Sequence, residues 1–170
     1  MSATHPNDLA VTERTDGRIP SFPVLIGVVY AACVVLISLS VVAEMAFGYA
    51  GQGDQPRSLG EQLVGILVFG HLALGISIIG ARSLRGSPRR ASIGAIVFGI
   101  LTIPALAFFW CGMPGMFGAA AAHLAGLTRP GRPADGAPRI FGIVGLVFAV
   151  ANPLLHVVLI SVSWLSELAS

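Results

Sequence analysis

The sequence predicts an all-α fold, a polytopic integral membrane helical bundle of five transmembrane helices with the N terminus cytoplasmic and the C terminus external. Two observations predict this class. The chain of 170 residues is 55% hydrophobic and only 11% charged, with a mean hydropathy of +0.84, which is too apolar for an ordinary soluble domain. Its basic residues are all arginine, and they stand in short clusters between long apolar runs. Such clusters are typical of loops that set membrane topology, and they do not indicate a nucleic-acid surface.

The first helix is expected at about residues 22–47, after a polar segment. Residues 1–21 mix acids and bases without apolar periodicity, which predicts a flexible cytoplasmic tail. The apolar run that follows is longer than the ~7–15 residues of a signal-peptide core, and no clear cleavage site ends it. We therefore expect an uncleaved span that opens a single transmembrane domain over residues 22–164.

The second and third helices are expected at about residues 59–81 and 91–110. A short loop containing Gly, Gln and Asp precedes the second helix, and a loop with four arginines follows it. Pro88 is well placed to start the third helix, because the first turn of a helix does not need the N–H that proline lacks. Pro104 predicts a kink within the third helix.

Residues 91–127 decide the number of spans, because they contain no charged residue. One helix of this length would measure about 55 Å at ~1.5 Å per residue, whereas the hydrocarbon core of a bilayer is ~30 Å thick. A break rich in Gly and Pro near the middle predicts instead a turn, with the fourth helix at about residues 113–127. We expect an external turn formed by Cys111, Gly112, Pro114 and Gly115. A bundle of four spans is the alternative.

The fifth helix is expected at about residues 140–164, with a short external tail at residues 165–170. The loop before this helix contains three prolines and two glycines, which exclude a continuous helix through it. Asn152 and Pro153 predict a kink within the fifth helix.

The arginine distribution favours five spans over four. With five spans, nine arginines are cytoplasmic and only Arg57 is external, whereas four spans divide them six against four. Tyr49, Trp110 and Trp164 also fall at outer ends in the five-span arrangement, where the interface favours such rings. The arginines of the two long loops, which we expect to determine the cytoplasmic side, are Arg82, Arg85, Arg89, Arg90, Arg129, Arg132 and Arg139.

Two faces of small residues predict close packing between helices, because helices in lipid gain from close van der Waals approach. The first face, on the second helix, consists of Gly70, Ala73, Ser77 and Ala81. The second face, on the fourth helix, consists of Gly118, Ala122 and Gly126. Each face is expected to pack within the chain or, alternatively, against a second copy.

Four ionisable residues within the expected spans are candidates for a functional site, because such groups are costly at membrane depth. They are His71, His123, His156 and Glu44, and Glu44 is taken as the only acid inside a span. The histidines are expected to be hydrogen-bonded packing residues, with a proton relay or ligation of metal or haem as alternatives. Glu44 would reach the interface or partner a buried histidine. No metal and no cofactor is predicted.

The second-to-third and fourth-to-fifth helical hairpins share a pattern that suggests duplication about an axis along the membrane normal. His71-Leu72 and Pro88-Arg89 in the first correspond to His123-Leu124 and Pro138-Arg139 in the second. At residues 70–73 (Gly-His-Leu-Ala) and 94–99 (Gly-Ala-Ile-Val-Phe-Gly) the chain resembles a small glycine-rich membrane-domain family of unknown function from high-GC Gram-positive bacteria. The Gly-Arg-Gly usual in that family's loop is missing. The resemblance implies a membrane hairpin fold and no transferable activity.

No catalytic pattern is present, so we expect a protein that is not an enzyme. The sequence has no Ser-His-Asp set, no paired carboxylates within one helix, no phosphate loop and no zinc spacing. Cys33 and Cys111 are far apart and are expected to be free thiols.

The expected function is that of a non-catalytic accessory or scaffold component that packs through its Gly/Ala faces. Its expected partners are the lipid bilayer and another membrane protein or a second copy, with no nucleic acid. A small transporter or channel subunit with a proton-linked histidine site is the alternative, and a haem-binding membrane protein is the third hypothesis. The use of arginine in place of lysine, with abundant Ala and Gly, favours a GC-rich bacterial genome and therefore the bacterial cytoplasmic (inner) membrane.

Overall fold

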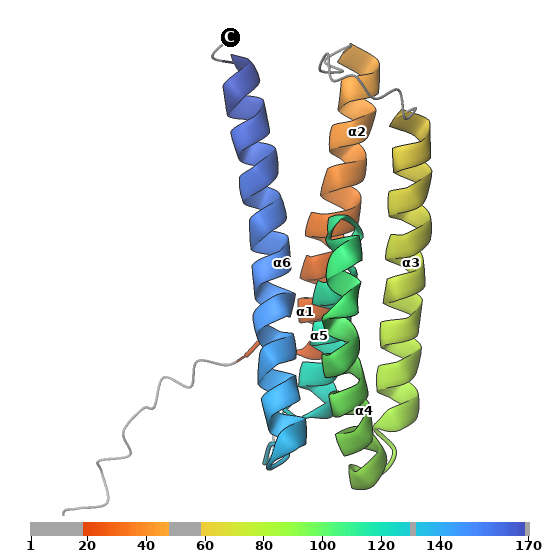
Figure 1. Cartoon of the computed structure of the whole chain (residues 1–170), viewed down its shortest axis with the longest axis vertical. Coiled ribbons are helices and arrows are strands. Elements are labelled where there is room, and N and C mark those ends of the chain that lie inside the picture. Colours follow the sequence, from red (N-terminus) through yellow and green to blue (C-terminus); the bar gives the residue numbers. More distant parts are fainter. Residues whose placement is uncertain (1–18, 48–58, 130–131, 169–170) are drawn as a thin grey trace, which may run out of the picture.

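The computed structural model is an elongated bundle of helices (Figure 1). It describes residues 19–47, 59–129 and 132–168, with a few side chains, including that of Glu44, excepted. These residues form helices, turns and short connections without a strand. Almost all of the predicted tail at residues 1–21, the Arg57 loop, Tyr49 and the last two residues lie outside the described residues.

The first helix is continuous from Phe22 to Phe47, as predicted. It consists of α1 (Phe22–Tyr30), the π-helical segment η1 (Ala31–Val35) and α2 (Leu36–Phe47). A proline in the first turn suits the start of α1, because no intrahelical partner is needed there. The wider π turn places Cys33 and Val34 in the core of the bundle, and such turns are frequent at functional sites.

The two longest helices that are α-helical throughout are α3 (Leu59–Leu84, 26 residues) and α6 (Ala137–Leu168, 32 residues). Both extend beyond their predicted limits of 59–81 and 140–164. Residues 165–168 therefore belong to α6 and not to a tail, and α6 continues as a helix through Pro153.

The chain between these helices forms a compact hairpin. It begins with α4 (Pro88–Thr102), where the Ser87 hydroxyl caps the helix by accepting a hydrogen bond of 3.3 Å from the Arg90 amide. The 3-10 helix η2 (Pro104–Cys111) follows after a bend of 73°, because the ring of Pro104 cannot continue the helix. Gly112, with a φ of 77°, then turns the chain into α5 (Met113–Leu124).

The hairpin helices are short. With 15 and 12 residues, α4 and α5 measure about 22 and 18 Å, which is less than the ~30 Å of a hydrocarbon core. Within the described residues, three helices have the length and apolarity to cross a membrane, and a fourth does if α4 and η2 act together. The prediction of five spans is therefore not confirmed. The lengths also differ between the two hairpins of the suggested duplication.

Helix α5 occupies the centre of the bundle, with α1, α3, α4 and α6 around it. All its residues except Met113 and His123 are buried. Gly118 and Gly145 lie at the crossing of α5 and α6, and a Cβ on either glycine would collide with the backbone of the other. The two helices can approach this closely because neither has a side chain at the crossing.

The two predicted faces of small residues are internal. Gly70, Ala73, Ser77 and Ala81 of α3 are buried, and so are Gly118 and Ala122 of α5. Gly126 does not belong to the second face, because the helix has already ended there. Its φ of 81° and the hydrogen bonds from Gly126 N to His123 O and from Leu127 N to Ala122 O make a glycine C-cap.

Candidate functional site

The turn that joins η2 to α5 lies inside the protein. Cys111 is fully buried, a Cβ on Gly112 would collide with Cys33, and a Cβ on Gly115 would contact Asn152. The expected external turn of Cys111, Gly112, Pro114 and Gly115 is therefore placed wrongly. The residues do form a turn, but their small size lets it pack between η1 and α6 instead of at the end of the bundle.

The turn lies about halfway along the bundle. Asn152, which Gly115 faces, is 15 residues after the first residue of α6 and 16 before the last (152−137 and 168−152). Helix α4 therefore runs toward the middle of α6, and α5 returns from there toward the N-terminal end of α6 (Figure 1).

Three buried polar side chains meet at this depth, one on η1 and two on α6. The Cys33 thiol donates a hydrogen bond of 2.8 Å to the side-chain oxygen of Asn152. The Asn152 amide in turn donates to the backbone carbonyl of Phe109 on η2, at 3.4 Å. His156 Nδ1 lies 2.8 Å from the backbone carbonyl oxygen of Asn152 and 3.6 Å from the Cys33 sulfur. We call Cys33, Asn152 and His156 the polar cluster.

His156 leaves one ring nitrogen available for a further partner. Because a carbonyl oxygen only accepts, Nδ1 carries the proton in the contact with Asn152, so the neutral ring has an acceptor at Nε2. Nε2 is buried and has no hydrogen-bond partner among the described residues. An unsatisfied buried polar atom costs about 1–3 kcal/mol. A hydrogen-bond donor, such as a water molecule or a small solute with an N–H or O–H group, would remove this cost, and Nε2 is also the ring atom that takes up a proton.

The other two histidines have separate local partners. His71 Nδ1 lies 2.6 Å from the Leu67 carbonyl oxygen, which only accepts, so Nε2 accepts the hydrogen bond of 2.9 Å from the Tyr30 hydroxyl. His123 stacks on Phe22 with ring centroids 4.6 Å apart, and its Nδ1 lies 3.0 Å from the Thr128 hydroxyl oxygen.

The three histidines consequently lie in three environments, and the structure does not bring two imidazoles together as haem ligation would need. Glu44, the expected carboxylate partner, has its side chain outside the described residues. In the described part of the chain, no group of three His, Cys, Asp or Glu residues could hold a metal ion.

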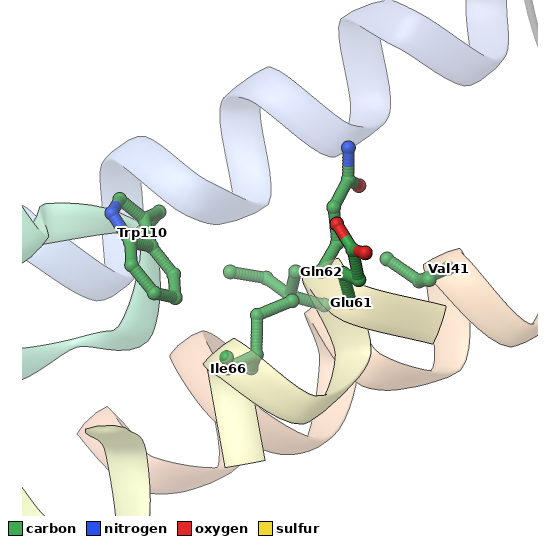
Figure 2. Close-up of a pocket in the computed structure, with 7 residues that line it drawn as sticks. Val41, Glu61, Gln62, Ile66 and Trp110 are labelled. Atoms are coloured by element: carbon green, nitrogen blue, oxygen red, sulfur yellow. The ribbon is translucent and has the colours of Figure 1, made fainter. Parts of the chain in front are cut away.

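A pocket of about 610 Å³ lies between α2 and α3 on the other side of the turn. Figure 2 shows Glu61 and Gln62 projecting from α3, Val41 on α2, and Trp110 of η2 at the opposite end. The Trp110 ring lies over Gly65, where a Cβ would be in ordinary van der Waals contact at 3.5 Å, and it packs edge-on against Phe69. Trp110 is therefore a partly buried wall of this pocket.

Sequence reasoning missed Glu61. It lies in the first turn of α3, inside the expected second span, so Glu44 is not the only acid within a span. A carboxylate in a first helical turn is stabilised by the helix dipole, and the pair Glu61-Gln62 at the start of a long apolar run was the available signal. Phe109, Trp110 and Cys111 are consecutive, so the turn contacts both the polar cluster and the pocket.

No protein-family model, curated protein or solved structure matches this chain. The resemblance to the glycine-rich family stays a prediction.

Proposed function

We propose that the protein is an integral protein of the bacterial cytoplasmic membrane with three full spans and one re-entrant hairpin made of α4, η2 and α5. The short hairpin helices and their turn beside the middle of α6 support this arrangement. Non-helical backbone at membrane depth is tolerated where protein surrounds it, and here η1, α3 and α6 do so. The N terminus is cytoplasmic and the C terminus external, because the junctions that carry the arginine clusters lie at one end of the bundle (Figure 1).

The function that the geometry supports best is that of a small, non-catalytic transport component with a proton-linked histidine, His156. The observation that carries this proposal is the buried, unpartnered Nε2 of His156 beside a backbone turn at mid-depth. Ionisable groups and broken helices at membrane depth are costly, and they are typical of ion and substrate pathways.

The pocket lined by Glu61 and Gln62 supplies the external approach in this proposal. Its inner wall, Trp110, is next in sequence to Phe109, whose carbonyl accepts a hydrogen bond from Asn152 of the polar cluster. The species that fits His156 Nε2 is a proton or a small polar solute that donates a hydrogen bond to this acceptor.

The test is proton flux into liposomes that contain the purified full-length protein and a pH-sensitive dye. A potassium diffusion potential, negative inside, should drive proton entry faster than in protein-free liposomes. His156→Leu should abolish the excess flux. His71→Leu is the matched control, because it removes the same chemical group from a lipid-exposed position and should leave the flux. The proposal would be refuted if the proton flux and the flux of monovalent cations both equalled those of protein-free liposomes.

The accessory or scaffold function remains a second candidate, supported by one observation on α6. The C-terminal half of α6 exposes apolar side chains over about 200° of its circumference at 100° per residue. These side chains are Leu154, Leu155, Val157, Val158, Leu159, Val162 and Leu165. A photoreactive residue at Val158 should crosslink one defined protein partner in cells if this function holds. A lipid adduct alone would exclude it.

A further inference from the structure

A groove runs between α1 and α3 at the arginine-rich end of the bundle, away from the polar cluster and its pocket. Its volume is about 480 Å³. Ile26 on α1 and Leu74 and Ile78 on α3 make its apolar walls, and Arg82 and Arg85 stand at one end.

The charge at that end is available to a ligand. Arg82 and Arg85 are both exposed, and none of the described residues that line the groove carries a carboxylate. Within the part of the chain that the structure describes, an ion pair is formed between an Arg132 guanidinium nitrogen and an Asp135 carboxylate oxygen 3.5 Å apart. Neither groove arginine takes part in it. Among the residues that the structure describes, the cationic end of the groove therefore has no carboxylate as a counter-charge.

The apolar part of the groove is long enough for the part of an acyl chain that is nearest the headgroup. Leu74 is eight residues before Arg82, so the apolar wall extends about 12 Å from the cationic end toward the middle of the bundle. A Cβ at Gly27 would meet no atom within 4 Å, which leaves the groove open on the α1 side. Free phosphate would match only the arginine end of such a site, whereas a phospholipid matches its whole length.

We propose that this groove binds one anionic phospholipid of the leaflet on the arginine-rich side. Its phosphate lies at Arg82 and Arg85, and an acyl chain lies along Ile26, Leu74 and Ile78. Basic pockets between transmembrane helices recognise anionic headgroups by this charge complementarity. The site is independent of the proposed transport function.

The first test is native mass spectrometry of the purified full-length protein with dioleoyl phosphatidylglycerol, or with dioleoyl phosphatidylcholine of the same chain length. The wild type should retain the anionic lipid in preference to the zwitterionic one. Each arginine near a membrane surface contributes about fivefold, so Arg82→Gln with Arg85→Gln should weaken retention about 30-fold. Arg89→Gln with Arg90→Gln is the matched control, because it removes equal charge from the first turn of α4, outside the groove. It should retain the lipid as the wild type does.

A second pair of variants tests the acyl-chain part of the groove without altering charge. Gly27→Leu should weaken retention of phosphatidylglycerol, because its side chain occupies the space beside α1. Gly75→Leu is the control, since Gly75 also has open space at its Cβ but does not line the groove. Thermal unfolding of all four variants identifies any that fail to fold.

Three results would each overturn the proposal. Equal loss of lipid in the two arginine double variants would indicate diffuse surface charge. Equal retention by Gly27→Leu and Gly75→Leu would mean that no acyl chain lies in the groove. Displacement of the lipid by millimolar inorganic phosphate would indicate a site for the free anion.

Discussion

The Cys33 thiol donates a hydrogen bond of 2.8 Å to the Asn152 side chain, and it thereby joins the π-helical segment of the first helix to the middle of the last. Replacing Asn152 with Leu removes this bond and the one to the Phe109 carbonyl, and it leaves the buried Cys33 thiol without this acceptor. The expected loss is about 1–3 kcal/mol of unfolding free energy, measured by denaturant titration in detergent. Ser161→Ala, which removes only a local bond to the Val157 carbonyl on an exposed face, should change it little.

The buried turn predicts that neither native cysteine is accessible. Cys33 and Cys111 are both free and fully buried, so a membrane-impermeant maleimide should label neither in intact cells nor in inverted vesicles. Leu165→Cys should be labelled in cells and Asp135→Cys only in inverted vesicles, since both positions are exposed at opposite ends of the bundle. Rapid labelling of Cys111 from outside would contradict the buried turn and support the external turn that the sequence predicts. Denaturation in detergent should expose both native thiols.

The α5–α6 crossing predicts strong intolerance of a side chain at Gly118. Gly118→Ala places a methyl group against the Gly145 carbonyl, so the helices must separate. Overpacking of this kind costs about 1–3 kcal/mol, measured as a lower unfolding temperature. Gly75→Ala is the matched control, because open space surrounds that Cβ and alanine favours a helix by about 1 kcal/mol. Equal stability of the two variants would contradict the crossing.

The position of Trp110 predicts its depth in a bilayer. Its ring packs against Gly65, six residues (about 9 Å) into α3, whereas Trp164 lies four residues before the end of α6. The Trp164→Phe variant retains only Trp110, and the Trp110→Phe variant retains only Trp164. In vesicles of brominated lipids, the bromine position that quenches Trp110 best should lie deeper in the bilayer than the position that quenches Trp164 best. The same optimum depth for both would place Trp110 at the interface, as five spans require.

The arginine pattern predicts the end at which each loop lies but cannot count the crossings between two loops. A hairpin that crosses twice and a hairpin that turns back at mid-depth both return the chain to its starting side. The division of nine arginines against one is therefore identical for the two arrangements. Helix lengths distinguish them, and those depend on where Pro104 and Gly112 interrupt the helix geometry.

Local patterns predicted the helices well and the polar cluster poorly. The first helix begins and ends where the apolar run does, and the turn lies at the Gly- and Pro-containing break. Cys33 and Asn152 are 119 residues apart, so no periodicity or spacing connects them. In the sequence, Asn152 indicates only a kink before Pro153. The depth of the turn depends on the absence of side chains at Gly112 and Gly115, which lets the turn pack against Cys33 and Asn152.

The burial of α5 has a consequence for biosynthesis. Helix α5 is synthesised before α6, yet α6 provides the cover over Gly118 and the carbonyl-lined crossing at Gly145. Until the last helix enters the membrane, the hairpin has an open flank that exposes small residues and backbone to whatever surrounds the nascent chain. The final helix therefore completes the assembly, and a chain that stops at residue 136 should be degraded even though every helix before it has been made.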